Sequence, residues 1–98
     1  MDRVGRTFVF DYGDLALRVR YVSGTKLTWE QLKGPSPGLK GEESYRGAEI
    51  RPDVHFIWWR EEDGSFMAQV VDFGERRVFS TWSAPGKEAE HFKGSVKG

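Results

Sequence analysis

The stretch that most constrains the fold is residues 54–73, VHFIWWREEDGSFMAQVVDF. Two apolar segments flank Asp63-Gly64, and Asp-Gly is typical of tight β-hairpins because a type I′ turn needs positive φ at both central residues. The stretch therefore predicts two antiparallel strands that fold back on one another. A two-residue loop would place Phe66 opposite Glu61, whereas a bulged three-residue loop would change the parity of that pairing.

The rest of the chain repeats this pattern of short strands and turns. Seven Phe, four Trp and three Tyr supply large side chains for pleated faces, and twelve Gly supply turns. No window of 12 or more residues keeps a helical repeat of apolar positions. Strands are expected at residues 5–12, 15–22, 25–32, 42–50, 54–61, 65–73, 76–83 and 88–97. The only long loop, residues 33–41, is either a lid or a flexible connection.

Eight short strands joined mainly by tight turns predict an all-β fold, an eight-stranded up-and-down antiparallel barrel. Closing the sheet removes its edges, and a barrel of this size has room for packed side chains or for one small ligand. A two-sheet sandwich is the alternative. The 98 residues are expected to form one domain, residues 1–98.

Charge and composition exclude several classes of binding partner and site. Lys+Arg and Asp+Glu both number 15, so no basic excess points to nucleic acid. No apolar run reaches the twenty or so residues that span a bilayer, and the first residues lack the apolar core of a secretory signal. The chain has no cysteine, which excludes disulfides and thiolate metal ligands. We therefore expect a soluble cytoplasmic protein without nucleic-acid or membrane partners.

Both faces of the first hairpin strand are apolar. His55, Ile57 and Trp59 alternate with Phe56 and Trp58. If one face lines the barrel interior, the other needs a partner, so the sequence predicts a homodimer.

Several segments resemble the MoaF-like proteins, small lipocalin-like (calycin) barrels that are distantly similar to the phenolic acid decarboxylases. The likeness is carried by IRPDVHFIWWRE at residues 50–61, by Asp63-Gly64 and by VDF at residues 71–73. GRTF at residues 5–8 and LTWE at residues 27–30 add to it. The resemblance implies a barrel with a pocket inside it.

The decarboxylases handle a para-hydroxycinnamate with two first-strand tyrosines, an arginine and a glutamate. By the resemblance, the tyrosine pair falls at Phe10 and Tyr12, so one hydroxyl is missing here. The glutamate falls at Glu61, and Arg46 is the nearest candidate for the arginine. These differences leave the pocket intact but put that particular reaction in doubt.

The residues themselves suggest a pocket at one end of the barrel, because alternate positions on each strand converge on the axis. Glu61, if desolvated, becomes a possible general acid or base, and Tyr12 a hydrogen-bond donor; a solvated strand-end acid and a rim tyrosine are the alternatives. Two histidines without fixed carboxylate spacing make a weak metal signal, so no metal or other cofactor is expected. The expected ligand-binding residues are Phe10, Leu17, Trp29, His55, Trp59 and Gln69, and the resemblance adds Arg46.

Three functions remain compatible with these observations. The first is a barrel that binds a small aromatic or apolar molecule. The second is a cofactor-independent lyase, isomerase or cyclase that acts on a small aromatic acid, with Glu61 as acid or base and Tyr12 as donor. The third is an oligomeric scaffold with a filled interior.

Overall fold

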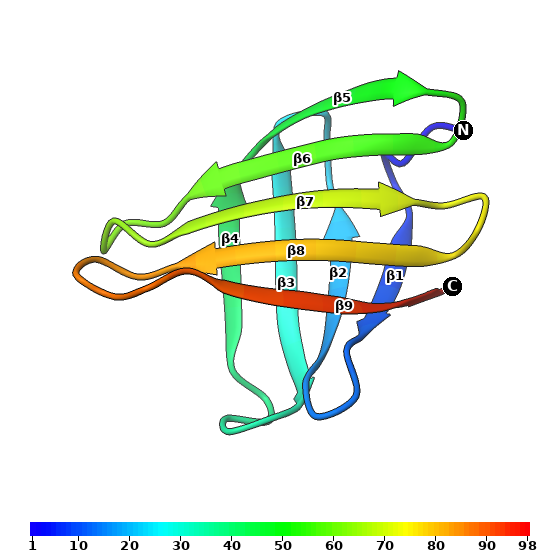
Figure 1. The fold of residues 1–98 in the computed structure, drawn as a ribbon. Helices are drawn as coiled ribbons and strands as arrows, with labels where there is room; N and C mark the ends of the chain where they lie inside the picture. Colours follow the sequence, from blue (N-terminus) through cyan, green and yellow to red (C-terminus); the bar gives the residue numbers. More distant parts are fainter.

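The computed structural model describes residues 1–98 and contains a single nine-stranded antiparallel sheet (Figure 1). Its strand order is β4-β3-β2-β1-β9-β8-β7-β6-β5, so most neighbours in the sheet are also neighbours in the chain. The strands are β1 (Thr7–Asp11), β2 (Ala16–Tyr21), β3 (Lys26–Lys33), β4 (Lys40–Ser44), β5 (Arg46–Arg51), β6 (Val54–Arg60), β7 (Phe66–Asp72), β8 (Arg77–Ser83) and β9 (Glu90–Lys97).

The sheet curls into a nearly closed barrel. In Figure 1, β5 to β9 form one layer that crosses in front of β1 to β4 at a steep angle. One side closes where β1 pairs with β9, with Phe10 opposite Val96. The other side stays open because β4 and β5 lie at the two ends of the strand order and do not pair. The all-β meander is confirmed, and the closed eight-stranded barrel is corrected to nine strands with one unsealed seam.

The extra strand arises at Tyr45, which divides the expected strand at residues 42–50 into β4 and β5. Tyr45 is buried, and its hydroxyl donates to the Ser23 carbonyl oxygen at 2.7 Å. Its backbone N–H donates to the Thr25 carbonyl at 2.8 Å, which keeps β4 in the first layer. The chain passes from one layer to the other at this residue, so one apparent strand becomes two.

The hairpin between β6 and β7 forms as expected, but with the bulged loop. Gly64 has φ 92° and Asp63 does not have positive φ, so the turn is not type I′. The Glu61 N–H donates to the Ser65 carbonyl at 2.7 Å, and the Gly64 N–H donates to Glu61 at 3.0 Å. Glu61 therefore lies opposite Ser65, and Phe66 lies opposite Arg60.

The exposure of alternate side chains shows which face of β6 is interior. His55, Ile57 and Trp59 are buried, whereas Phe56 and Trp58 are each 38% exposed. The interior core consists of alternate residues from both layers, as expected for a barrel. Its buried members are Phe8, Phe10, Val19, Tyr21, Leu27, Tyr45, Ile57, Trp59, Val71, Phe73, Val78 and Val96.

Candidate functional site

One end of the barrel keeps several of its inward-facing side chains only half-buried. It is flanked by the β1–β2 and β3–β4 connections, at the bottom of Figure 1, and by the β6–β7 and β8–β9 connections, at its left. Strand register turns several apolar side chains inward here, yet they are only half-buried. We call these the open-end residues: Tyr12, Leu17, Trp29, Met67 and Phe92. Water therefore reaches these inward-facing side chains at this end of the barrel.

The opposite end is closed by the N-terminal segment. The Arg3 guanidinium lies over the rings of Tyr21 and Tyr45, 5.9 and 5.3 Å from their centroids. Arg3 also donates to the Tyr45 hydroxyl at 3.1 Å and to His55 Nδ1 at 2.8 Å. The N-terminal segment therefore covers this end of the interior.

A polar cluster lies inside the barrel behind the open end. The hydroxyls of Tyr12 and Ser80 are 2.7 Å apart. Gln69 Nε2 donates to Ser80 Oγ at 3.3 Å and to the Tyr12 hydroxyl at 3.5 Å. Gln69 is 1% exposed, and its Oε1 has no hydrogen-bond partner. Burial raises the pKa of Tyr12 to about 12, so its hydroxyl stays protonated at neutral pH.

Two carboxylates and two indoles lie on the seam side of the same end. Trp59 Nε1 donates to Glu61 Oε2 at 3.3 Å, and Trp29 Nε1 donates to Glu43 Oε2 at 3.0 Å. Partial burial raises the pKa of Glu61; the indole hydrogen bond lowers it, and the charge of Glu43 raises it further. The Trp29 ring lies so close to Gly41 that a Cβ added there would clash with it.

The β3–β4 loop is tied to the wall of the open end. Gln31 is buried, and its side-chain oxygen accepts a hydrogen bond from the Ser36 N–H. Its backbone N–H donates to the Leu39 carbonyl at 2.8 Å, and its carbonyl accepts from Gly38 at 2.7 Å. Gly34 and Gly38 have positive φ, which allows this compact path. These contacts order the loop that the sequence left as either a lid or a flexible connection.

The structure brings most of the sequence-predicted site residues to one region. Phe10 and Trp59 are buried in the interior, and Gln69 belongs to the polar cluster with Tyr12. Leu17 and Trp29 are open-end residues. Glu61 and Tyr12 face this same end, but they are bonded to different partners rather than to each other.

Two predicted ligand contacts lie elsewhere. Arg46 is exposed on β5 opposite Trp58, whose side chain points outward, so it does not join Glu61 inside. His55 is buried at the closed end with Arg3. Because Arg3 can only donate, His55 Nδ1 accepts and Nε2 carries the proton. Burial, followed by the Arg3 charge, lowers the pKa of His55.

The sequence reading missed Ser80 and Arg3. Ser80 alternates with Val78 and Trp82 on β8, and this was the only signal that it faces inward. Arg3 precedes the first strand, and no periodicity relates it to the interior.

Comparison with known proteins identifies the family. A sequence model described as MoaF-like matches residues 4–97, nearly the whole chain. The chain belongs to the MoaF-like family. The resemblance carried by the central hairpin is thereby confirmed, and no curated protein matches significantly.

A solved structure supports the same fold. It is described as the crystal structure of a "putative beta-lactamase" from Burkholderia vietnamiensis. The TM-score is 0.92 at 23% sequence identity, and the match covers 99% of this chain and 95% of the other. At this identity the likeness extends to the fold alone.

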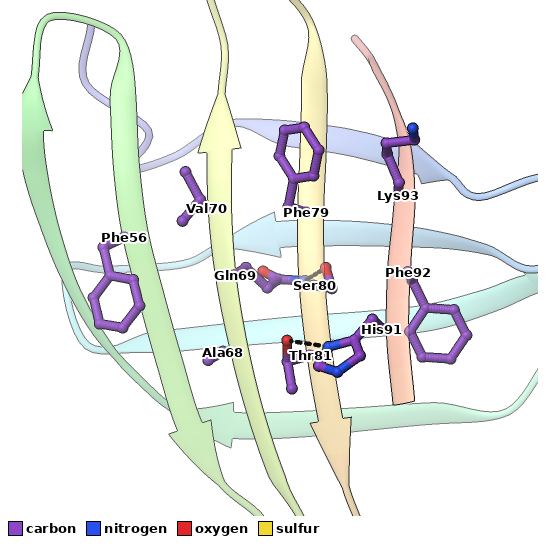
Figure 2. A pocket seen from close by; sticks show the side chains of 10 residues that line it. All are labelled: Phe56, Ala68, Gln69, Val70, Phe79, Ser80, Thr81, His91, Phe92 and Lys93. Carbon is purple, nitrogen blue, oxygen red and sulfur yellow. Dashed lines mark hydrogen bonds between the residues drawn. The ribbon is translucent and has the colours of Figure 1, made fainter. Parts of the chain in front are cut away.

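The outer wall of this MoaF-like barrel carries a separate, shallow apolar groove of about 400 Å³ (Figure 2). Phe56, Val70 and Phe79 project from three neighbouring strands, β6, β7 and β8. Thr81 Oγ1 and His91 Nδ1, 3.0 Å apart, lie at its lower side in this view. Most of its lining side chains point outward, and Gln69, Ser80 and Phe92, whose strands form its floor, also line it.

A third feature is the seam itself, which holds a groove of similar volume, about 400 Å³. Arg46 and Arg60 flank Trp58 there.

No group of three or more His, Cys, Asp or Glu residues is arranged to hold a metal ion. The structure has no helix of the length and apolarity that crossing a membrane requires.

Proposed function

We propose that this protein is a small-molecule-binding barrel that takes an aromatic or apolar ligand through its open end. The observation that carries the proposal is the set of open-end residues, which face the barrel axis but remain half-buried. Apolar walls with a few convergent polar groups are typical of ligand sites. The polar cluster of Tyr12, Ser80 and Gln69 supplies those groups.

The difference in burial between the two ends of the barrel supports binding over a filled scaffold. The closed end is occupied by Arg3, the aromatic rings of Tyr21 and Tyr45, and His55. An interior packed for stability alone would bury Leu17 and Met67 as fully as it buries Val19 and Val71. The half-buried side chains therefore favour a functional opening.

A second candidate is a cofactor-independent lyase, isomerase or cyclase that acts on a small aromatic acid. The raised pKa of Glu61 favours it, because a general acid or base works best near the ambient pH. Against it, Glu61 is bonded to Trp59 while Tyr12 is bonded to Ser80. Arg46, the expected partner of a substrate carboxylate, lies outside the barrel wall. We therefore rank binding first.

The Burkholderia neighbour raises the question of a nucleophilic serine, and Ser80 is the inward-facing candidate. A serine nucleophile needs a base that accepts its proton. Tyr12, its hydroxyl neighbour, has a pKa of about 12 and remains protonated at neutral pH. Gln69 is neutral and donates to Ser80. The surroundings of Ser80 therefore favour hydrogen bonding to a ligand over nucleophilic attack.

The test is calorimetric titration with benzyl alcohol and indole as aromatic probes. Met67→Gln is close to isosteric and makes the open end polar, so it should weaken binding at least tenfold. Phe79→Gln, in the outer groove, is the matched control and should leave binding unchanged. Thermal melting checks that both variants fold. Binding that survives Met67→Gln and is lost in Phe79→Gln would assign the ligand to the outer groove instead, and no binding of either probe would contradict the proposal.

A further inference from the structure

We propose that the Tyr12–Ser80–Gln69 cluster receives an uncharged carboxamide-type group and discriminates against carboxylates. This inference rests on the proposed function, because it names the ligand class for the same open end. It also departs from the decarboxylase resemblance, which implies an aromatic acid as the ligand.

Hydrogen-bond accounting in the cluster leaves one donor and one acceptor unused. Both Nε2 protons of Gln69 are directed to the two hydroxyls, at 3.3 and 3.5 Å. Only one proton lies between Tyr12 and Ser80, whichever of the two donates across their 2.7 Å contact. The second hydroxyl proton is therefore free to donate, and Gln69 Oε1 is free to accept.

Of the two unused groups, the acceptor, Gln69 Oε1, has the stronger need for a hydrogen-bond partner. Gln69 is 1% exposed, and a buried carbonyl oxygen without a partner costs free energy because water no longer bonds it. A ligand that displaces the side chains covering Gln69 Oε1 and brings an N–H to it would recover that loss. A ligand that brings a carboxylate would place two acceptors against each other. The cluster therefore matches a group that donates and accepts through adjacent atoms, as a primary carboxamide does.

The charges around the open end also disfavour a carboxylate ligand. The inward-facing ionisable groups on its seam side are the carboxyls of Glu43 and Glu61. The arginines that could offset an anion are elsewhere, since Arg46 is on the outer surface and Arg3 is bonded at the closed end. A ligand anion would meet like charges in a partly desolvated site, where repulsion is strong.

The body of the ligand is expected to be aromatic. The Phe92 ring contacts the Tyr12 ring edge-on, with centroids 5.7 Å apart, beside the polar cluster. Trp29 and Met67 are half-buried at the same end and offer further apolar contact. A planar ring that carries a carboxamide would place its apolar part against these side chains and its polar part on the cluster.

Three ligands that share the cinnamoyl group test the inference: cinnamamide, methyl cinnamate and cinnamate, titrated at pH 8 by calorimetry. The amide donates and accepts, the ester only accepts, and the acid is ionised. We expect affinity to fall at least tenfold from amide to ester and further to the acid. In Gln69→Met, which removes Oε1 at similar volume, the preference for amide over ester should fall to less than threefold. Thermal melting confirms that the variant folds.

The outcomes separate the two proposals. If cinnamate binds the wild-type protein as tightly as cinnamamide, or if the ester binds as tightly as the amide, the carboxamide inference is wrong although the barrel still binds ligands. An unchanged amide preference in folded Gln69→Met also overturns it. If none of the three binds and neither benzyl alcohol nor indole binds, the proposed function itself fails.

Discussion

At the scale of single residues, the loop type of the β6–β7 hairpin determines the surroundings of Glu61. The bulged loop puts Glu61 opposite Ser65, and its side chain lies against the indole of Trp59. Burial beside that ring, with Glu43 nearby, raises its pKa. The sequence offered a desolvated acid or a solvated strand-end acid, and the direction of the pKa shift favours the first.

This environment predicts a pH dependence for Glu61→Gln. A carboxyl whose folded-state pKa is raised adds stability that is fully present below its unfolded pKa, about 4.3, and is lost as pH rises through its folded pKa. The wild-type protein should therefore lose stability relative to Glu61→Gln between pH 4 and pH 7. Urea unfolding of both proteins across this range measures the difference, and Glu62→Gln, an exposed neighbour, is the control. A difference that shrinks as pH rises would contradict the assignment.

Alternation along the strands grouped several expected site residues on one face but left open which hairpin face lines the interior, and the structure buries them there. Phe10, Trp59 and Gln69 face inward because every second residue of a strand shares a face. Arg46 was assigned only through a resemblance to other barrels, and register places it beside the outward-facing Trp58. Ser80 was missed because a serine in a strand has no distinguishing pattern. Hydrogen-bond partners from distant strands become visible only in three dimensions.

At the scale of elements, seven of the eight expected strands correspond to single observed strands. The exception, residues 42–50, has few apolar residues, so alternation could not reveal that Tyr45 ends one strand and starts the next. The loop type at Asp63-Gly64 was also undecided by sequence. Asp-Gly fits both turns, since glycine supplies positive φ in either one.

The N-terminal segment closes one end of the barrel through Arg3. Replacing Arg3 with Met removes its hydrogen bonds to Tyr45 and His55 and leaves the buried His55 Nδ1 unpaired. We expect a loss of about 1–3 kcal/mol in the free energy of unfolding. Arg6→Met is the control, because Arg6 is exposed and lies over Phe8 without a side-chain hydrogen bond, and it should cost about 0.5 kcal/mol or less. Equal losses in the two variants would show that Arg3 does not close the barrel.

At the scale of the whole molecule, the outer face of β6 to β8 remains uncovered in the single chain. Phe56 and Trp58 are 38% exposed and Phe79 is 42% exposed, all on this face. Apolar patches of this kind mark interaction surfaces. Because the chain has zero formal net charge, two copies carry no overall repulsion. The homodimer stays a prediction, and we propose that a second copy covers this face.

Sedimentation velocity at micromolar concentration tests the dimer. The wild-type protein should sediment as a dimer, and Phe56→Ser combined with Phe79→Ser should give a monomer. Val22→Ser, an exposed apolar residue outside this face, should leave the dimer intact. A clean wild-type monomer would contradict the proposal.

We propose that the ligand enters the barrel interior at the open end. The most direct measurement is the set of nuclear Overhauser contacts between bound indole and the protein's methyl groups. We predict contacts to Leu17 and Met67, which face the interior at the open end. Contacts only to Ala68 and Val70, which line the outer groove, would contradict it.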